Sequence, residues 1–230
     1  MQYEPAKFYQ DIMGSELGQV YWELGGQLFT LSSIYADCAY LFGDNSEGRV
    51  ELLNKAAHRF FWKVQQTFES ELMLGICRLT DPAQNMKKNN LTVMKLADLV
   101  NIGVPGAGTQ VAVLAKKATA LTDFARDWRN RWLAHTDYDL SVSKSEATAL
   151  KLATLEKIDA ALTAVDNTLK AVMSAYKFSS SGFRIISEYA AGPSLISILD
   201  EGLQARELRI ERAEMGNATD EDMAFHTRRI

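Results

Sequence analysis

The sequence predicts an all-α protein: an antiparallel bundle of four long helices with short additional helices at the C-terminus. In four segments, apolar residues recur at alternating steps of four and three, which keeps one face of an α-helix against a core. Short connections separate these segments, and short connections force neighbouring helices to run in opposite directions. Nothing in the sequence is typical of a β-strand. A helical bundle is therefore the fold that we expect.

The first long helix is expected at residues 15–42 and the second at residues 46–79. Ser15 and Ser46 stand where these helices begin, and a serine at a helix start can accept a hydrogen bond from a free backbone N–H group. Three glycines weaken the first helix by roughly 1 kcal/mol each relative to alanine, namely Gly18, Gly25 and Gly26.

The third long helix is expected at residues 108–137 and the fourth at residues 143–177, with a shorter helix around residues 92–100 before them. The fourth opens with Ser143-Lys-Ser-Glu146. This is a capping box, in which the serine and glutamate side chains satisfy free backbone N–H groups at the helix start.

The best internal boundary is the polar stretch Ser179–Gly182. Three parts are expected, namely a helical bundle at residues 1–178, appended C-terminal helices at residues 179–215 and a flexible tail at residues 216–230. The appended helices are expected near residues 183–190 and 193–215, the second with a proline in its first turn.

Composition indicates an ordinary globular protein. Of the 230 residues, 47% are hydrophobic and 23% are charged, with a net charge of −4, so contact with RNA would need a local basic patch. Cys38 and Cys77 each fall inside a helical pattern, which argues against a disulfide framework. No signal peptide or membrane-spanning stretch is evident. We therefore expect a cytoplasmic protein without membrane contact.

Familiar metal and phosphate motifs are absent from the sequence. The three histidines are His58, His135 and His226, and no two of them have the spacing of zinc ligands. The loop Gly103–Gly108 lacks the Lys-Ser/Thr pair of a phosphate-binding loop. His58 is expected to be a partly buried structural residue and His226 to be solvated. We expect neither a metal nor a cofactor.

Residues 123–138 concentrate cationic and aromatic side chains at the end of the third helix. At about 100° per residue, His135 lies about 20° from Trp128 on the apolar face. On the same straight helix, Arg131 lies about 40° from His135 and Arg129 about 120° from it. Arg129 would therefore meet His135 only through a bend or from a second copy of the helix.

A purely structural interpretation of this segment is also possible. His135 would then be a core histidine at a helix C-terminus, where the helix dipole favours its charged form. The arginines would pair with Asp123 and Asp127, which lie at helical spacing from them.

The segment resembles the motif of the HEPN superfamily (higher eukaryotes and prokaryotes nucleotide-binding), an arginine and a polar residue followed by a histidine. Arg129-Asn130 and His135 have this spacing. The sequence Ala134-His135-Thr136-Asp137 resembles the AbiU-like branch, which is associated with abortive infection in bacteria. Arg78-Leu-Thr-Asp81 resembles a second motif of that branch, which closes an earlier helix. The resemblance covers roughly residues 10–178.

The resemblance implies a metal-independent ribonuclease whose site forms across a homodimer. His135 would act as general acid or base, Arg129 would neutralise the phosphate, and Asn130 would orient the phosphate or the histidine. Further binding candidates are Arg131, Arg126, Asp137 and Tyr138, and the second motif adds Arg78 and Asp81.

Three hypotheses follow. The first is a homodimeric endoribonuclease of a bacterial defence or toxin–antitoxin type system, and the second is a non-catalytic HEPN module that binds a nucleotide, RNA or a protein. The third is a plain structural bundle. A cognate antitoxin or a nucleotidyltransferase is a possible partner, because such enzymes modify a tyrosine near the histidine in some HEPN toxins. Here Tyr138 follows His135 by three residues.

Overall fold

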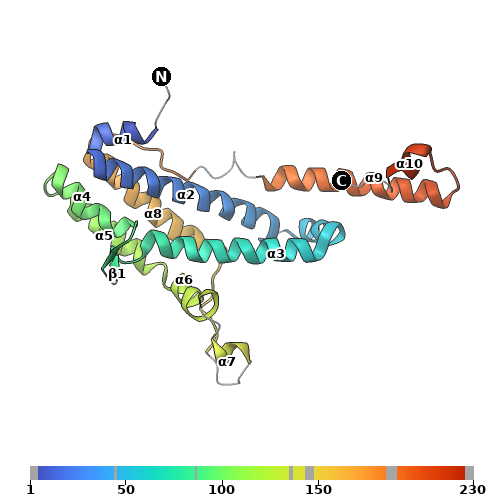
Figure 1. Ribbon diagram of the computed structural model, residues 1–230, viewed down its shortest axis with the longest axis horizontal. Coiled ribbons are helices and arrows are strands. Elements are labelled where there is room, and N and C mark those ends of the chain that lie inside the picture. The colour runs from blue at the N-terminus through green and yellow to red at the C-terminus, as the bar shows by residue number, and fades with distance from the viewer. Residues whose placement is uncertain are drawn as a thin grey trace.

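The computed structural model describes residues 5–43, 46–85, 87–134, 137–142, 148–184 and 191–225. Long helices dominate this part of the chain and form a bundle (Figure 1), so the predicted all-α fold is confirmed. None of its helices has both the length and the apolar character needed to cross a membrane.

The described part of the chain begins with a helical hairpin that was not predicted from the sequence. Helix α1 (Pro5–Met13) packs against α2 (Ser15–Phe42), and the turn is made at Gly14, whose φ is 86°. A Cβ atom on Gly18 would lie 2.4 Å from the backbone Cα of Gln10, so glycine permits this close approach. Residues 15–42 were predicted correctly, but Gly14 rather than Ser15 occupies the cap position.

Helix α3 (Glu47–Thr80) confirms the second predicted helix. It is kinked at Ala57, whose φ and ψ of −166° and 71° are not helical. Ser46 occupies the cap position, as predicted, without a hydrogen bond from its side chain. Farther along, a Cβ on Gly75 would lie 2.4 Å from Leu31 Cδ2, so a glycine allows α2 and α3 to pack closely.

A short connection follows α3. Strands β1 (Gln84–Asn85) and β2 (Lys88–Asn89) form a two-residue antiparallel ladder. The 3₁₀ turn η1 (Val93–Lys95) and helix α4 (Leu96–Gly103) then fulfil the prediction of a shorter helix in this region.

The third predicted helix is not continuous, and this corrects the expectation of one helix over residues 108–137. It consists of α5 (Gly108–Ala120), α6 (Asp123–Trp128) and the π-helical turn η2 (Arg129–Leu133). At the break, Thr122 Oγ1 donates to the Thr119 carbonyl, 2.8 Å away. Side chains that bond to nearby backbone compete with the helical ladder, which accounts for the break. Helix α7 (Tyr138–Ser141) follows.

The fourth helix starts later than predicted. Helix α8 (Leu155–Ala175) begins after Thr154, whose hydroxyl accepts a hydrogen bond from Lys157 N, whereas the predicted capping box at residues 143–146 lies outside the described residues. Residues 148–154, which we call the strap, are irregular because their backbone groups bond to α6 and η2 instead.

The core lies between α2, α3, α5 and α8 (Figure 1). Its fully buried side chains include Leu24, Leu28, Leu72, Ile76, Leu162 and Leu169. Burial of a leucine or isoleucine contributes about 1.5–3 kcal/mol, so buried side chains of this kind provide most of the driving force for folding.

Helix α9 (Gly192–Glu214) confirms the helix predicted at residues 193–215 and extends beyond the bundle (Figure 1). It contacts a small second core that contains Leu53 and Phe61 of α3. Helix α10 (Asp220–Phe225), which was not predicted, lies within the segment expected to be a tail. The helix predicted near residues 183–190 falls mostly outside the described residues. The proposed division of the chain remains a prediction.

Candidate functional site

Arg129 is the first residue of the π-helical turn η2. The N–H of Ala134 donates to the Arg129 carbonyl over 2.8 Å, a step of five residues instead of the four of an α-helix. Such turns interrupt α-helices frequently at functional sites. The angles that the sequence analysis took from a straight helix therefore do not apply beyond Arg129.

The side chain of Arg129 reaches back to the end of α3. Its Nη1 lies 2.6 Å from Oδ2 of Asp81, the residue that caps α3, and its Nε donates to Asn130 Oδ1 over 3.1 Å. The side chains of Arg129 and Asp81 are 28% and 23% exposed. The fold thus joins two motifs that lie 48 residues apart in the sequence.

Arg126 has a structural position beside this pair. Its guanidinium donates to the Thr80 carbonyl over 2.7 Å, to the Thr119 carbonyl over 3.1 Å and to the Thr122 hydroxyl. Its Nε also lies 3.7 Å from Asp81 Oδ1. Arg126 therefore holds the break between α5 and α6 against the end of α3, and its charge lies beside the carboxylate that binds Arg129.

Arg131 points to the strap instead. Its Nε lies 3.2 Å from Asp137 Oδ2, its Nη1 lies 3.6 Å from Asp127 Oδ1, and its Nη2 donates to the Thr148 carbonyl. The pairing with Asp127 agrees with the structural interpretation of the sequence, whereas Arg129 and Arg126 pair with Asp81, which the sequence analysis did not foresee. Arg131 thus holds the strap.

The two remaining binding candidates lie at α7. Asp137 caps this helix by accepting a hydrogen bond from Leu140 N over 3.1 Å. That bond, followed by the one from Arg131, lowers the pKa of Asp137. The side chain of Tyr138 is largely exposed. The hydrogen bonds of the Arg129 side chain go to Asp81 and Asn130 instead.

Of the second motif, only Asp81 joins the site. Arg78 is 57% exposed and pairs with Glu71 over 3.0 Å, where it lines a groove between α2 and α3. Its side chain therefore belongs to a different surface from Arg129.

The histidines give a mixed result. His135 lies outside the described residues, so its position relative to Arg129 stays a prediction; His226 lies outside them too. His58 was expected to be partly buried, but it is exposed on α3, where its ring bonds to Asn54 Oδ1 over 2.9 Å. Within the described residues, no group of three or more His, Cys, Asp or Glu side chains could hold a metal ion.

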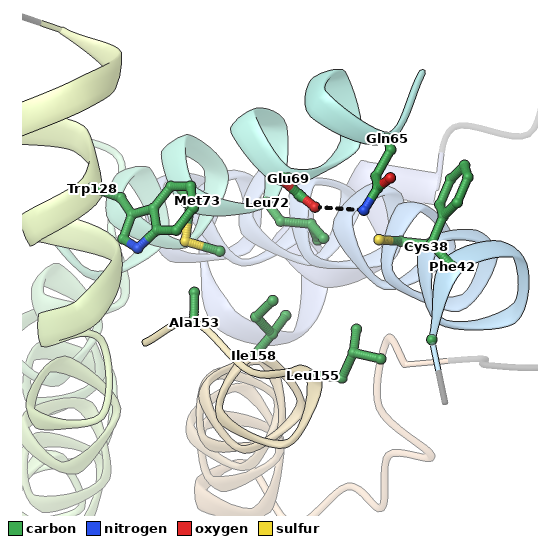
Figure 2. A pocket seen from close by; sticks show the side chains of 11 residues that line it. Cys38, Phe42, Gln65, Glu69, Leu72, Met73, Trp128, Ala153, Leu155 and Ile158 are labelled. Atoms are coloured by element: carbon green, nitrogen blue, oxygen red, sulfur yellow. Dashed lines mark hydrogen bonds between the residues drawn. The ribbon is translucent and has the colours of Figure 1, made fainter. Parts of the chain in front are cut away.

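A cavity of about 170 Å³, which no sequence motif had indicated, lies between α2, α3, α6 and α8 (Figure 2). Trp128 lines one end and Phe42 and Cys38 the other, with Glu69 along one wall. Burial, and after it the charge of Glu69, raises the pKa of the Cys38 thiol to about 11, so the thiol is neutral at physiological pH. One sequence feature could have indicated this cavity. Glu69 places a carboxylate between the apolar positions Phe68 and Leu72.

The helical bundle and the Arg129-Asn130 pair at the end of its third segment define a protein of the HEPN class. Comparison with known families matches the AbiU2 family of HEPN proteins over residues 15–192, which is more than half of the chain. The chain therefore belongs to this family, as the sequence resemblance predicted. No curated protein and no solved structure matched the chain.

Proposed function

We propose that this AbiU2-family protein is a homodimeric, metal-independent endoribonuclease of a bacterial defence or toxin–antitoxin type system. The observation that carries the proposal is the geometry of Arg129. Asp81 and Asn130 fix two sides of its guanidinium, while its Nη2 group has no hydrogen-bond partner within the described residues. A guanidinium held in this way presents N–H groups to a phosphate without having to be ordered first.

In this scheme Arg129 stabilises the negative charge that develops on the phosphate. One His135 removes the proton from the RNA 2′-hydroxyl, whose oxygen attacks the adjacent phosphorus. The bond from phosphorus to the 5′-oxygen breaks, and a second acid, His135 of the other copy, supplies the proton to that oxygen. The products are a 2′,3′-cyclic phosphate and a 5′-hydroxyl. Asn130 orients Arg129 through its side-chain oxygen.

The homodimer is proposed from the surface around the motif. Trp132, Tyr138, Val142 and Leu152 are all substantially exposed and lie in the segments next to Arg129. Exposed apolar and aromatic side chains of this kind favour burial against another surface, and a two-fold dimer is the commonest arrangement of identical chains. Tyr138 is also exposed enough for modification by a nucleotidyltransferase partner.

Cleavage of a labelled single-stranded RNA in excess EDTA tests the proposal. The wild-type protein should cut the RNA and leave a 2′,3′-cyclic phosphate, whereas His135→Ala should lose about 10²- to 10⁴-fold in rate. Arg129→Ala should be similarly impaired. Arg131→Ala should retain more activity than Arg129→Ala because Arg131 holds the strap, and Arg78→Ala serves as an exposed control.

Undiminished cleavage by His135→Ala would mean that the site is elsewhere. If the wild-type protein cuts nothing, the second candidate, a non-catalytic binding module, takes its place. One observation favours that candidate: each of Arg126, Arg129 and Arg131 already has a carboxylate partner, which leaves less positive charge for catalysis. A module of this kind would bind RNA without cutting it, and Arg129→Ala would weaken that binding.

A further inference from the structure

The cavity beside Trp128 has the size of a single ring system. Its volume is about 170 Å³, and an engineered protein cavity of about 150 Å³ is known to hold benzene. Several of its walls are apolar, formed by Leu72, Met73, Leu155 and Ile158. The indole of Trp128 is held by a hydrogen bond from its Nε1 to the Lys151 carbonyl, 2.8 Å long. The cavity therefore offers a fixed aromatic surface and apolar walls to a flat ligand.

Glu69 provides the polar recognition. Among the described residues that line the cavity, it alone carries a formal charge, because the neutral thiol of Cys38 adds none. Gln65 donates to Glu69 Oε1 over 3.1 Å, which Figure 2 shows, and Gln66 donates to Glu69 Oε2 over 3.4 Å, so each oxygen holds one hydrogen bond that fixes the carboxylate. A carboxylate has about four acceptor positions, so these oxygens can accept further hydrogen bonds. The occupant should therefore be a flat group with N–H donors, whereas an anion would be repelled.

We propose that the cavity binds a guanine base. Guanine presents two adjacent donors on its Watson–Crick edge, the N1–H and the 2-amino group, which match the two oxygens of Glu69. Adenine, cytosine and uracil each place an acceptor beside the donor on that edge, so a carboxylate would repel them. The proposal rests on the RNA-directed function above and deepens it, since it specifies which nucleotide is recognised.

The cavity is also connected to the arginine site. Trp128 immediately precedes Arg129, and both Trp128 and Arg131 hold the strap, which contributes Ala153 to the cavity wall. Along α3, the twelve residues from Glu69 to Asp81 correspond to about 18 Å. A single strand of RNA can therefore place a base in the cavity and a phosphate one or two nucleotides farther along at Arg129.

Calorimetric titration of the full chain with GMP and with AMP tests this proposal. Both ligands carry the same phosphate, so their difference reports the base alone. One bidentate base contact discriminates by about 1–3 kcal/mol, or about 5- to 150-fold, and GMP should bind more tightly than AMP by a factor in this range. Glu69→Gln should remove the preference. Glu71→Gln, two residues along α3 and outside the cavity, should keep it.

Equal binding of GMP and AMP by the wild-type protein would overturn the inference, and so would a GMP preference that persists in Glu69→Gln. These outcomes are independent of the proposed cleavage. A protein that cuts RNA but binds both nucleotides equally would retain its proposed function and lose the guanine site. A protein that prefers GMP but cuts nothing would retain the site, with the cleavage proposal refuted.

Discussion

Replacing Arg126 with alanine tests whether this arginine holds the α5–α6 break against α3. Its side chain is only 21% exposed, and it donates to Thr80, Thr119 and Thr122. The side chains of Thr80 and Thr122 are fully buried, so the acceptors that it leaves behind gain little hydration. Hydrogen bonds to charged groups contribute about 1.5–3 kcal/mol each and are not additive. We expect the free energy of unfolding to fall by about 3 kcal/mol, which corresponds to roughly 6–12 °C in Tm.

Urea unfolding followed by far-UV circular dichroism measures this loss. Arg78→Ala is the matched control, because Arg78 lies on the exposed surface of α3 and pairs only with Glu71 among the described residues. An exposed ion pair contributes at most about 1 kcal/mol, so this variant should remain close to the wild type. If Arg126→Ala loses no more stability than Arg78→Ala, the structural role assigned to Arg126 is wrong.

Further predictions concern glycines, a thiol and assembly. Gly26→Ala should stabilise the protein by about 0.5–1 kcal/mol, because nothing lies within 4 Å of the added Cβ. Gly18→Ala should destabilise it, because the added Cβ would collide with the backbone of Gln10. Urea unfolding of the two variants measures both effects. Burial raises the pKa of Cys38 from 9.0 to about 11. Its thiolate fraction at pH 8 is then about 100-fold below that of an ordinary thiol, so alkylation should be slower by at least that factor than in urea, and fast labelling would contradict the burial. Because the folded-state pKa is raised, the associated stability is complete below pH 9 and is lost between about pH 9 and 11. Light scattering should give twice the chain mass of 25.7 kDa, and only a 25.7 kDa species would exclude the dimer at the concentration measured.

The sequence predicted most of the long helices, because the spacing of apolar residues within one segment is enough to indicate a helix. Residues 15–42 and 46–79 formed helices within a residue or two of the prediction, and the helix at 193–215 was also placed correctly. The same spacing did not predict that the third helix breaks at Thr122 or that the fourth begins only at Leu155. At both places, hydrogen bonds between side chains and backbone determine where the helix breaks or begins, and apolar spacing does not report such bonds.

The sequence also identified the motif at Arg129 and Asn130 and the second motif at Asp81, because these residues match a family pattern. It assigned Asp127 as an arginine partner, which holds for Arg131, but it did not assign Asp81 as the partner of Arg126 and Arg129. A straight helix places Arg131 closer than Arg129 to His135, but the π-helical turn and the fold direct Arg131 to the strap and Arg129 to Asp81. An ion pair across 48 residues depends on how two helices cross, which no local pattern encodes.

The amino-acid sequence by itself thus determined the fold class, the main helices and the family, since each depends on residue spacing along one segment. Only the tertiary structure decided that Arg126 and Arg129 both lie beside the carboxylate of Asp81, and that Glu69 and Trp128 share a cavity. These arrangements bring together side chains from distant helices. Helix packing decides which of them meet. An apolar face can be buried against many different neighbours, whereas a polar side chain finds a hydrogen-bond partner in only a few arrangements.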